Sequence, residues 1–214
     1  MFKHYCVMLM LALQVTALTT QAQEWVEGEH YDVISPAIRG TGTGKIEVVE
    51  FFWYGCGGCY SFEPLVVQWK KTLADDVAVI GSPAMWNALM EVHAKAYFAA
   101  EALGVLDRVH IPLFQAIYLD RKRLQSEGDL ADLFAANGVA REDFSKAFNS
   151  FGVSSQVRQA NARARAAKIT STPEMMVAGK YRISTRKAGG HAGMLKLANF
   201  LLEKERGERA AASS

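Results

Sequence analysis

The chain has few cysteines, no excess of charge of either sign and no internal repeats. Of its three cysteines, Cys6 lies near the amino terminus, and only Cys56 and Cys59 lie in the remaining chain. Two cysteines cannot build the disulfide framework of a small secreted scaffold. The 24 Lys and Arg residues balance 22 Asp and Glu residues, giving a formal net charge of +2. This balance gives no indication of nucleic acid or another polyanion as a partner.

Residues 1–22 have the features of a cleaved secretory signal peptide. Lys3 gives a basic start, Val7–Val15 is almost wholly apolar, and Thr20-Gln21-Ala22 offers a small-x-small cleavage site. The apolar run is too short to span a bilayer, which disfavours an uncleaved membrane anchor. We therefore expect export to an oxidising compartment, where a lone pair of cysteines can be reactive. About 190 residues would remain, enough for one domain with or without an inserted subdomain.

The most informative pattern is Cys56-Gly57-Gly58-Cys59, which directly follows the apolar run Ile46–Tyr54 and precedes an amphipathic run. At such a strand-to-helix junction, the first sulfur lies where unpaired N–H groups and the positive end of the helix dipole favour a thiolate. Two intervening residues leave the second thiol close enough to close a disulfide. The pair can therefore exchange two electrons with a partner protein, and this chemistry needs no bound cofactor.

Alternating and helical patterns predict an α/β fold in which a mixed sheet is interrupted by helices. We expect five strands, at residues 31–34, 46–52 (central), 77–80, 174–178 and 181–184. We expect helices at residues 59–73 (bent at Pro64), 92–103, 106–119, 130–137, 141–151 and 194–206. Gly104, Gly128, Gly138 and Gly152 lie where we expect helices to stop. The predicted domain organisation is a first sheet part (23–82), an all-helical insertion (83–165), a second sheet part (166–209) and a frayed tail (210–214).

This order of elements is that of a thioredoxin-like fold with an inserted helical domain. Separate segments carry a more specific similarity: Gly44–Glu50, Phe52–Cys56, Cys59–Pro64, Asn149–Phe151 and Gly179–Arg182. They resemble segments of the DsbA family of bacterial periplasmic thiol-disulfide oxidoreductases. The resemblance extends over nearly the whole chain after the signal, with the motifs in the same order.

The resemblance implies a role for each matching residue. Cys56 would be the exposed nucleophile that forms mixed disulfides, and Cys59 would be the buried thiol that resolves them. Thr172-Pro173 matches the family's cis-proline loop, which would bind an extended substrate strand beside Cys56. Glu50 matches a buried acid that assists proton transfer at Cys59. The alternative for Glu50 is a partly solvated acid at the end of a strand.

The resemblance also implies partners and a location. The substrates would be unfolded or reduced exported proteins in the periplasm, and a DsbB-like membrane quinone reductase would reoxidise the enzyme. Since no long apolar dimerisation arm is visible in the sequence, we expect a monomer.

Three departures from the family leave the direction of electron flow open. Gly57-Gly58 replaces the Pro-His pair usual in DsbA proteins, and without that histidine we expect a less favoured thiolate and a less oxidising disulfide. Gly81 stands where a basic partner of Glu50 is usual, which weakens the proton-relay hypothesis. Thr172 resembles the residue found in periplasmic disulfide isomerases. A dithiol oxidase is the favoured interpretation, and a disulfide reductase or isomerase is the alternative.

A binding protein is the rival interpretation from another class. Cys56 and Cys59 could hold a soft ion such as Cu(I), with Met175 and Met176 near the proline loop, although strand packing accounts for the methionines equally well. Two thiolates alone leave a zinc site incomplete. Three histidines are isolated in the sequence without the spacing of a metal site, so we expect structural or surface roles for them: His93, His110 and His191.

Overall fold

The computed structural model describes residues 24–213. Its strands are β1 (Asp32–Val33), β2 (Ile46–Phe52), β3 (Val77–Pro83), β4 (Glu174–Val177) and β5 (Tyr181–Ser184). Its helices are α1 (Gly57–Lys70), α2 (Ala88–Ala102), α3 (Leu106–Phe114), a π-helical turn η1 (Gln115–Leu119), α4 (Glu127–Ala136), α5 (Arg141–Phe148), α6 (Phe151–Ala166) and α7 (His191–Ala212). The expected signal peptide lies outside the described residues.

The five strands form one mixed sheet in the order β1-β5-β4-β2-β3. β2 is an interior strand, parallel to β3 and antiparallel to β4, and all seven of its residues are buried. Its sequence Ile-Glu-Val-Val-Glu-Phe-Phe suits a strand that is covered on both faces. The register places Glu50 opposite Gly81 on β3 and Met175 on β4. The predicted central strand is therefore confirmed.

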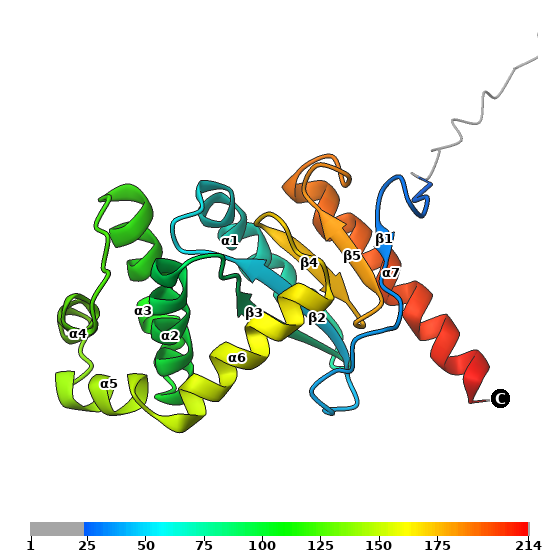
Figure 1. The fold of residues 1–214 in the computed structure, drawn as a ribbon. Coiled ribbons are helices and arrows are strands. Elements are labelled where there is room, and N and C mark those ends of the chain that lie inside the picture. The colour runs from blue at the N-terminus through cyan, green and yellow to red at the C-terminus, as the bar shows by residue number, and fades with distance from the viewer. Residues whose placement is uncertain (1–23, 214) are drawn as a thin grey trace, which may run out of the picture.

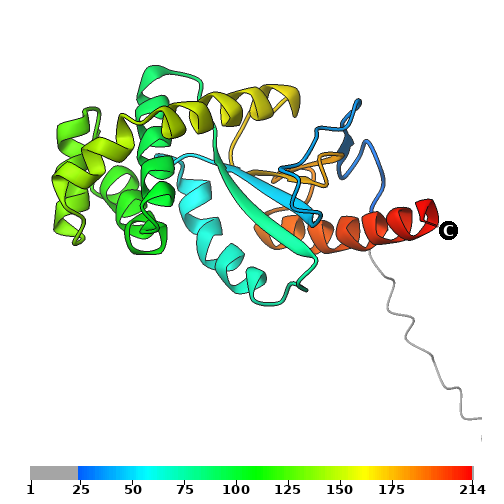
Figure 2. The same ribbon diagram turned by 90° about the horizontal axis from the view of Figure 1, so that it is seen from below.

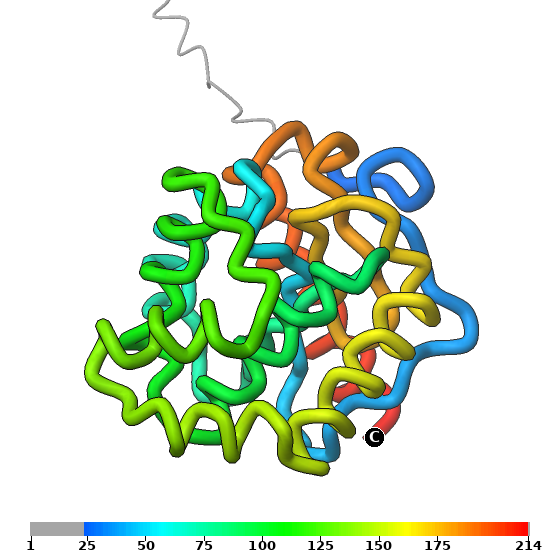
Figure 3. The backbone as a smooth tube through the Cα atoms, turned by 60° about the vertical axis from the view of Figure 1, so that its left-hand side comes forward, coloured from blue at the N-terminus to red at the C-terminus, as the bar shows by residue number. Residues whose placement is uncertain are grey.

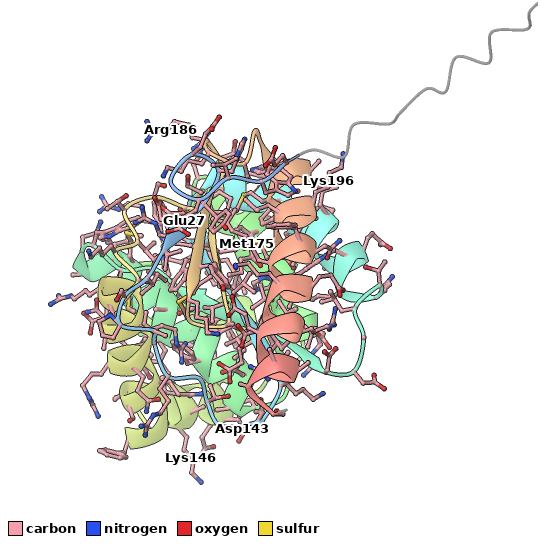
Figure 4. The ribbon with its side chains drawn as sticks, turned by 90° about the vertical axis from the view of Figure 1, so that its right-hand side faces the viewer. Glu27, Asp143, Lys146, Met175, Arg186 and Lys196 are labelled. Atoms are coloured by element: carbon pink, nitrogen blue, oxygen red, sulfur yellow. The ribbon has the colours of Figure 1, made fainter. Side chains whose placement is uncertain are left out.

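Helices cover both faces of the sheet. α1 and α7 lie against one face and α6 crosses the other (Figures 1 and 2). On the first face, Met175 packs in a core with Phe62 of α1 and Met194 of α7. Figure 4 shows Met175 in the interior beside α7. On the opposite face, Met176 packs with Ala164 of α6, because successive residues of a strand point to opposite sides.

Helices α2 to α5 and η1 form a unit beside the sheet, in green at the left of Figure 1 and again in Figure 3. Aromatic residues fill its core; the Phe134 and Phe144 rings lie 4.2 Å apart. α6 links this unit to the sheet, because it contacts both α2 and β3. The thioredoxin-like fold with an added helical unit is as predicted. The exact domain boundaries, at residues 83 and 165, stay a prediction.

Two of the glycines expected to stop helices lie at helix starts instead. Ser126 and Ser150 cap α4 and α6 by accepting backbone N–H bonds at 3.1 Å, and Gly128 and Gly152 follow them within the first turn. A first-turn N–H has no intrahelical partner, so a glycine costs little there. Because we expected Gly152 to end a helix, we did not predict α6 as a separate helix after residue 151. Two other glycines, with φ of +66° and +74°, do end helices as expected: Gly104 and Gly138.

Two further differences concern helix lengths. α7 continues to Ala212, although we expected a frayed tail from residue 210. Alanine has the highest helix propensity, and an Arg209–Glu205 ion pair at 2.9 Å spans the last turns. α1 runs through Pro64 as one helix, and the expected bend there stays a prediction. None of the described helices is both long enough and apolar enough to cross a membrane.

Candidate active site

Cys56 is the N-cap residue of α1. The chain leaves β2 at Phe52, turns, and enters the helix at Gly57, so Cys56 has extended backbone angles (φ −91°, ψ 114°). Its Sγ atom accepts a hydrogen bond from the backbone N–H of Cys59 at 3.2 Å. Both cysteines are free thiols, Cys56 half-buried and Cys59 buried. This is the strand-to-helix junction that the sequence predicts.

The two thiols have opposite acidities. A hydrogen bond from Cys59, helped by bonds from Thr172 and from backbone N–H groups, lowers the pKa of Cys56 to about 6 despite partial burial. Burial, and then the neighbouring Cys56, raise the pKa of Cys59 far above its ordinary value. A thiolate is the nucleophile in disulfide exchange, whereas a buried neutral thiol is protected from the bulk. At neutral pH, Cys56 is therefore the thiol that ionises, and Cys59 holds its proton.

The loop before β4 lies against the cysteines. The Thr172–Pro173 peptide bond is cis, as predicted. In the thiol form, Cys56 Sγ donates to the carbonyl oxygen of Thr172 at 3.3 Å, and Pro173 is buried. Thr172 is half-buried and borders the reactive sulfur. An extended chain bound along this loop would run beside Cys56.

A buried carboxylate anchors this loop. Glu174, 2% exposed, accepts from the backbone N–H of Ser171 at 3.0 Å and from its hydroxyl at 2.7 Å. Arg182 on β5 lies 3.7 Å from the other carboxylate oxygen. The hydroxyl of Thr185 donates to the carbonyl of Pro173 at 3.0 Å. Side chains on β4 and just after β5 thus fix the loop from two sides.

Glu50 is a buried acid without a basic residue opposite it on β3. It is 4% exposed, which excludes the partly solvated alternative, and Gly81 is its neighbour in the register. Burial, and then the negative charge of Glu63, raise the pKa of Glu50 to about 8, while Lys70 acts in the opposite direction. Glu50, Glu63 and Lys70 line one cavity of about 380 Å³ between α1, β3 and the helical unit. Glu50 is therefore largely protonated at neutral pH.

One acid–base pair beside this cavity was not predicted from the sequence. His110 Nε2 lies 3.4 Å from Glu63 Oε2, and its Nδ1 lies 2.8 Å from the hydroxyl of Tyr54. Burial opposes ionisation of Glu63, but the hydrogen bond and charge of His110 lower its pKa overall. One signal was available, because Glu63 follows Cys59 by four residues and so lies one helical turn below it. These contacts are consistent with the structural role that we expected for His110, but the sequence did not indicate Glu63 and Tyr54 as its partners.

His93 has the structural role that we expected. Its Nδ1 accepts from Trp53 Nε1 at 3.1 Å, and its Nε2 lies 2.9 Å from the carbonyl oxygen of Arg123. The imidazole is 1% exposed and nearly parallel to the indole. These contacts fix the turn that follows β2.

The methionines do not support a copper site. Met175 and Met176 pack on opposite faces of the sheet and cannot converge on one ion. Among residues 24–213, no group of three or more His, Cys, Asp or Glu side chains is arranged to hold a metal ion.

Comparison with known proteins shows the family. The family model of the DSBA-like thioredoxin domain matches residues 82–201. The chain belongs to this DsbA-like family. The thiol:disulfide interchange protein DsbA of Pseudomonas aeruginosa is 39% identical over 198 residues, which are 92% of this chain and 94% of that protein. DsbA of Pseudomonas syringae pv. tomato is 37% identical over 204 residues, 95% of each chain.

Solved DsbA structures have the same fold. The crystal structure of Pseudomonas aeruginosa DsbA has a TM-score of 0.83 at 40% identity and covers 89% of this chain and 97% of that one. The DsbA structure from Xylella fastidiosa has a TM-score of 0.79 at 31% identity, covering 85% and 98%. The fold class and the family resemblance that the sequence indicated are both confirmed.

Proposed function

We propose that this chain is a thiol:disulfide oxidoreductase that uses the Cys56–Cys59 pair as a dithiol oxidase for exported proteins. The observation that carries the proposal is the contrast between the two thiols. Cys56 is accessible, caps a helix and has its pKa lowered to about 6, while Cys59 is buried and keeps its proton. Membership of the DsbA-like family supports the same activity.

The proposed reaction begins from the oxidised pair. A substrate thiolate attacks Cys56 Sγ, the Cys56–Cys59 bond breaks, and Cys59 leaves with the electron pair and takes up a proton. A second substrate thiolate attacks the substrate sulfur of the mixed disulfide, and Cys56 leaves as a thiolate. The substrate thereby loses two electrons, which reduce the enzyme's disulfide. The half-buried Thr172 and the buried Pro173 would hold the substrate segment beside Cys56.

Glu50 is the proposed proton carrier for Cys59. A carboxyl whose pKa is raised to about 8 exchanges protons readily near neutral pH. The cavity of about 380 Å³ that Glu50 lines extends to exposed residues such as Asp107, which offers a route for protons to solvent. Lys70, at the end of α1, supplies a positive charge to this cavity in place of a basic residue on β3.

The oxidase direction is favoured over the reductase or isomerase direction. A stabilised thiolate favours the reduced enzyme, which makes the disulfide more oxidising. The pKa of Cys56 is lowered to about 6 although Gly57 and Gly58 replace the expected Pro-His pair. Replacement of the Pro-His pair by two glycines is therefore compatible with an oxidising pair.

The family also supports the setting of the reaction. DsbA-like proteins act on exported proteins in the periplasm, and we infer the same location here. Residues 1–22 would be the signal peptide that directs export. A DsbB-like membrane quinone reductase would return the enzyme to its oxidised form, and the enzyme would act as a monomer.

Serine variants of the two cysteines test the proposal. With a two-cysteine peptide, the oxidised mature protein should close the peptide's disulfide stoichiometrically, and Cys56→Ser should abolish this. Cys59→Ser keeps the nucleophile and should accumulate a mixed disulfide with an oxidised peptide, visible by mass. Persistent peptide oxidation by Cys56→Ser would contradict the mechanism. A mixed disulfide on Cys59 in that variant would reverse the assigned roles.

A further inference from the structure

The space beside Gly58 is bordered by groups from three elements. A Cβ atom on Gly58 would lie 3.2 Å from Pro173 Cδ, 3.7 Å from Cys56 Sγ and 3.9 Å from His191 Nε2. The attacking sulfur and an imidazole nitrogen thus border the same small volume. Gly58 does not have the positive φ that would require glycine. The missing side chain at position 58 instead leaves this volume open between the sulfur and the imidazole.

His191 is held in place by its local structure. It is the first residue of α7, and the turn before it uses Gly189 and Gly190 at φ of +74° and +108°. The N–H of Gly190 donates to the carbonyl of Thr185 at 2.8 Å, which closes that turn. The imidazole packs on the Phe62 ring of α1, with centroids 4.9 Å apart. The ring is therefore oriented by packing on the same helix that carries Cys56.

Within residues 24–213, the imidazole nitrogens of His191 make no hydrogen bond or ion pair with another side chain. Partial burial lowers its pKa, so the ring is largely neutral while Cys56 carries no charge. Neither ring nitrogen is thus committed to a structural partner. An uncommitted imidazole can take a proton when a negative charge forms nearby.

Other charged groups near the sulfur do not supply a cation. From β2, Glu50 is coupled electrostatically to Cys56, and its charge would oppose a thiolate. From α1, Cys59 offers an N–H and a neutral thiol. In the turn before α7, Lys187 is engaged by Asp32 and by the carbonyl of Gly28. His191 is therefore the titratable group of α7 that borders the same space beside Gly58 as the reactive sulfur.

We propose that His191 is a positioning residue that stabilises the Cys56 thiolate across the space left open by Gly58. When Cys56 leaves the mixed disulfide with its electron pair, the imidazole takes a proton from solvent and faces the thiolate as a cation. On reoxidation, Cys56 forms a new S–S bond and the proton returns to solvent. The inference rests on the proposed function of Cys56 and adds a second element, α7, to the control of its acidity.

The test is a pH titration of thiolate absorbance in the reduced full-length mature protein. His191→Gln removes the charge and should raise the Cys56 pKa by about one unit, with a tenfold shift of the glutathione equilibrium toward the oxidised enzyme. His191→Lys keeps a positive charge at this position, so its Cys56 pKa should lie at least halfway back from the Gln value toward the wild-type value. Lys196→Gln, which removes an exposed charge from the next turns of α7 (Figure 4), is the matched control and should leave the pKa unchanged.

A purely structural role would give different results. Equal Cys56 pKa values in wild type and His191→Gln would overturn the proposal. So would a Lys variant that raises the pKa as much as Gln does. By reciprocity, the NMR-detected pKa of His191 should be higher in the reduced than in the oxidised protein, and equal values would also contradict it. Loss of all peptide oxidation in wild type would instead refute the proposed function, so the two failures are distinguishable.

Discussion

The hydroxyl of Tyr118 lies over Gly57, 2.5 Å from the point where a Cβ atom on that glycine would be. Tyr118 comes from η1, and its ring also lies 5.6 Å from the ring of Tyr60. A proline at position 57, usual in the DsbA family, has no room here unless Tyr118 moves. Glycine at this position and tyrosine on η1 therefore form a matched pair.

The pair should show energetic coupling. Gly57→Ala and Tyr118→Ala should each lower the unfolding free energy of the oxidised protein. In the double variant, the loss should be smaller than the sum of the two single losses by about 0.5–1 kcal/mol, because alanine at position 57 fits once the phenol is gone. Urea unfolding of the four proteins measures this. Gly207→Ala on α7, where a Cβ meets no atom within 4 Å, is the control and should be additive with Tyr118→Ala. Additivity of the Gly57 pair would disprove the steric account.

The reduction potential should change its pH dependence near the pKa of Cys56, which is about 6. Below that pH, reduction takes up two protons per two electrons, so the potential falls by about 60 mV per pH unit. Above it, Cys56 stays a thiolate, and once the pH is also high enough that His191 no longer takes up a proton on reduction, the slope halves to about 30 mV. Glutathione equilibria at several pH values measure the slopes. A constant slope of about 60 mV up to pH 8 would mean that Cys56 is not an acidic thiol.

Glu50→Gln should change how stability depends on pH. The Glu50 pKa rises from 4.5 to about 8 on folding, so its contribution to stability is complete below pH 4.5 and is lost as pH rises through about 8. Glutamine cannot ionise, so the variant should gain roughly 1–3 kcal/mol over wild type between about pH 5 and about pH 8. Urea unfolding of the oxidised proteins measures this, and Glu91→Gln on the surface of α2 is the control. Parallel pH curves for Glu50→Gln and wild type would show that Glu50 ionises normally.

Glu174 should contribute both to stability and to substrate binding, because its carboxylate anchors the loop beside Cys56. Glu174→Ala removes the acceptor of the Ser171 N–H and hydroxyl, while Arg182 keeps its 2.8 Å ion pair with Asp32, so we expect a loss of about 1–3 kcal/mol in unfolding free energy. Ser171→Ala removes one hydrogen bond and should cost about 1 kcal/mol. This milder variant should also raise the KM for peptide oxidation while kcat changes less, because the substrate loop loosens. An unchanged KM would show that the anchor does not position the loop for substrate.

Local sequence patterns were enough to predict the reactive pair and its setting. The run Ile46–Phe52 followed by Cys56 and Cys59 determines a strand, a turn and a capped helix within 15 residues, and each step follows from local chemistry. The Pro173 loop was placed by its position before a strand and by the family resemblance. The same local signals misled at Gly152, because a glycine after a serine cap reads like a glycine that ends a helix.

Tertiary approach explains what the sequence could not predict. Tyr118 and His191 are 61 and 133 residues beyond the two glycines that they border. His110 reaches Glu63 only because α3 packs beside α1's cavity. Neither a periodic pattern nor the spacing of residues in the sequence reveals such contacts. Of these contacts, that of His110 lowers the pKa of Glu63 against the effect of burial, and that of His191 is the one proposed to act on Cys56.

The reduction potential of the Cys56–Cys59 pair tests the central claim most directly. The mature protein would be equilibrated in graded glutathione buffers at about pH 7, and its free thiols quantified by alkylation and mass. A dithiol oxidase should have a potential above about −200 mV, well above the glutathione couple. A value near that of thioredoxin, about −270 mV, would contradict the oxidase assignment and mean that the pair reduces or reshuffles disulfides.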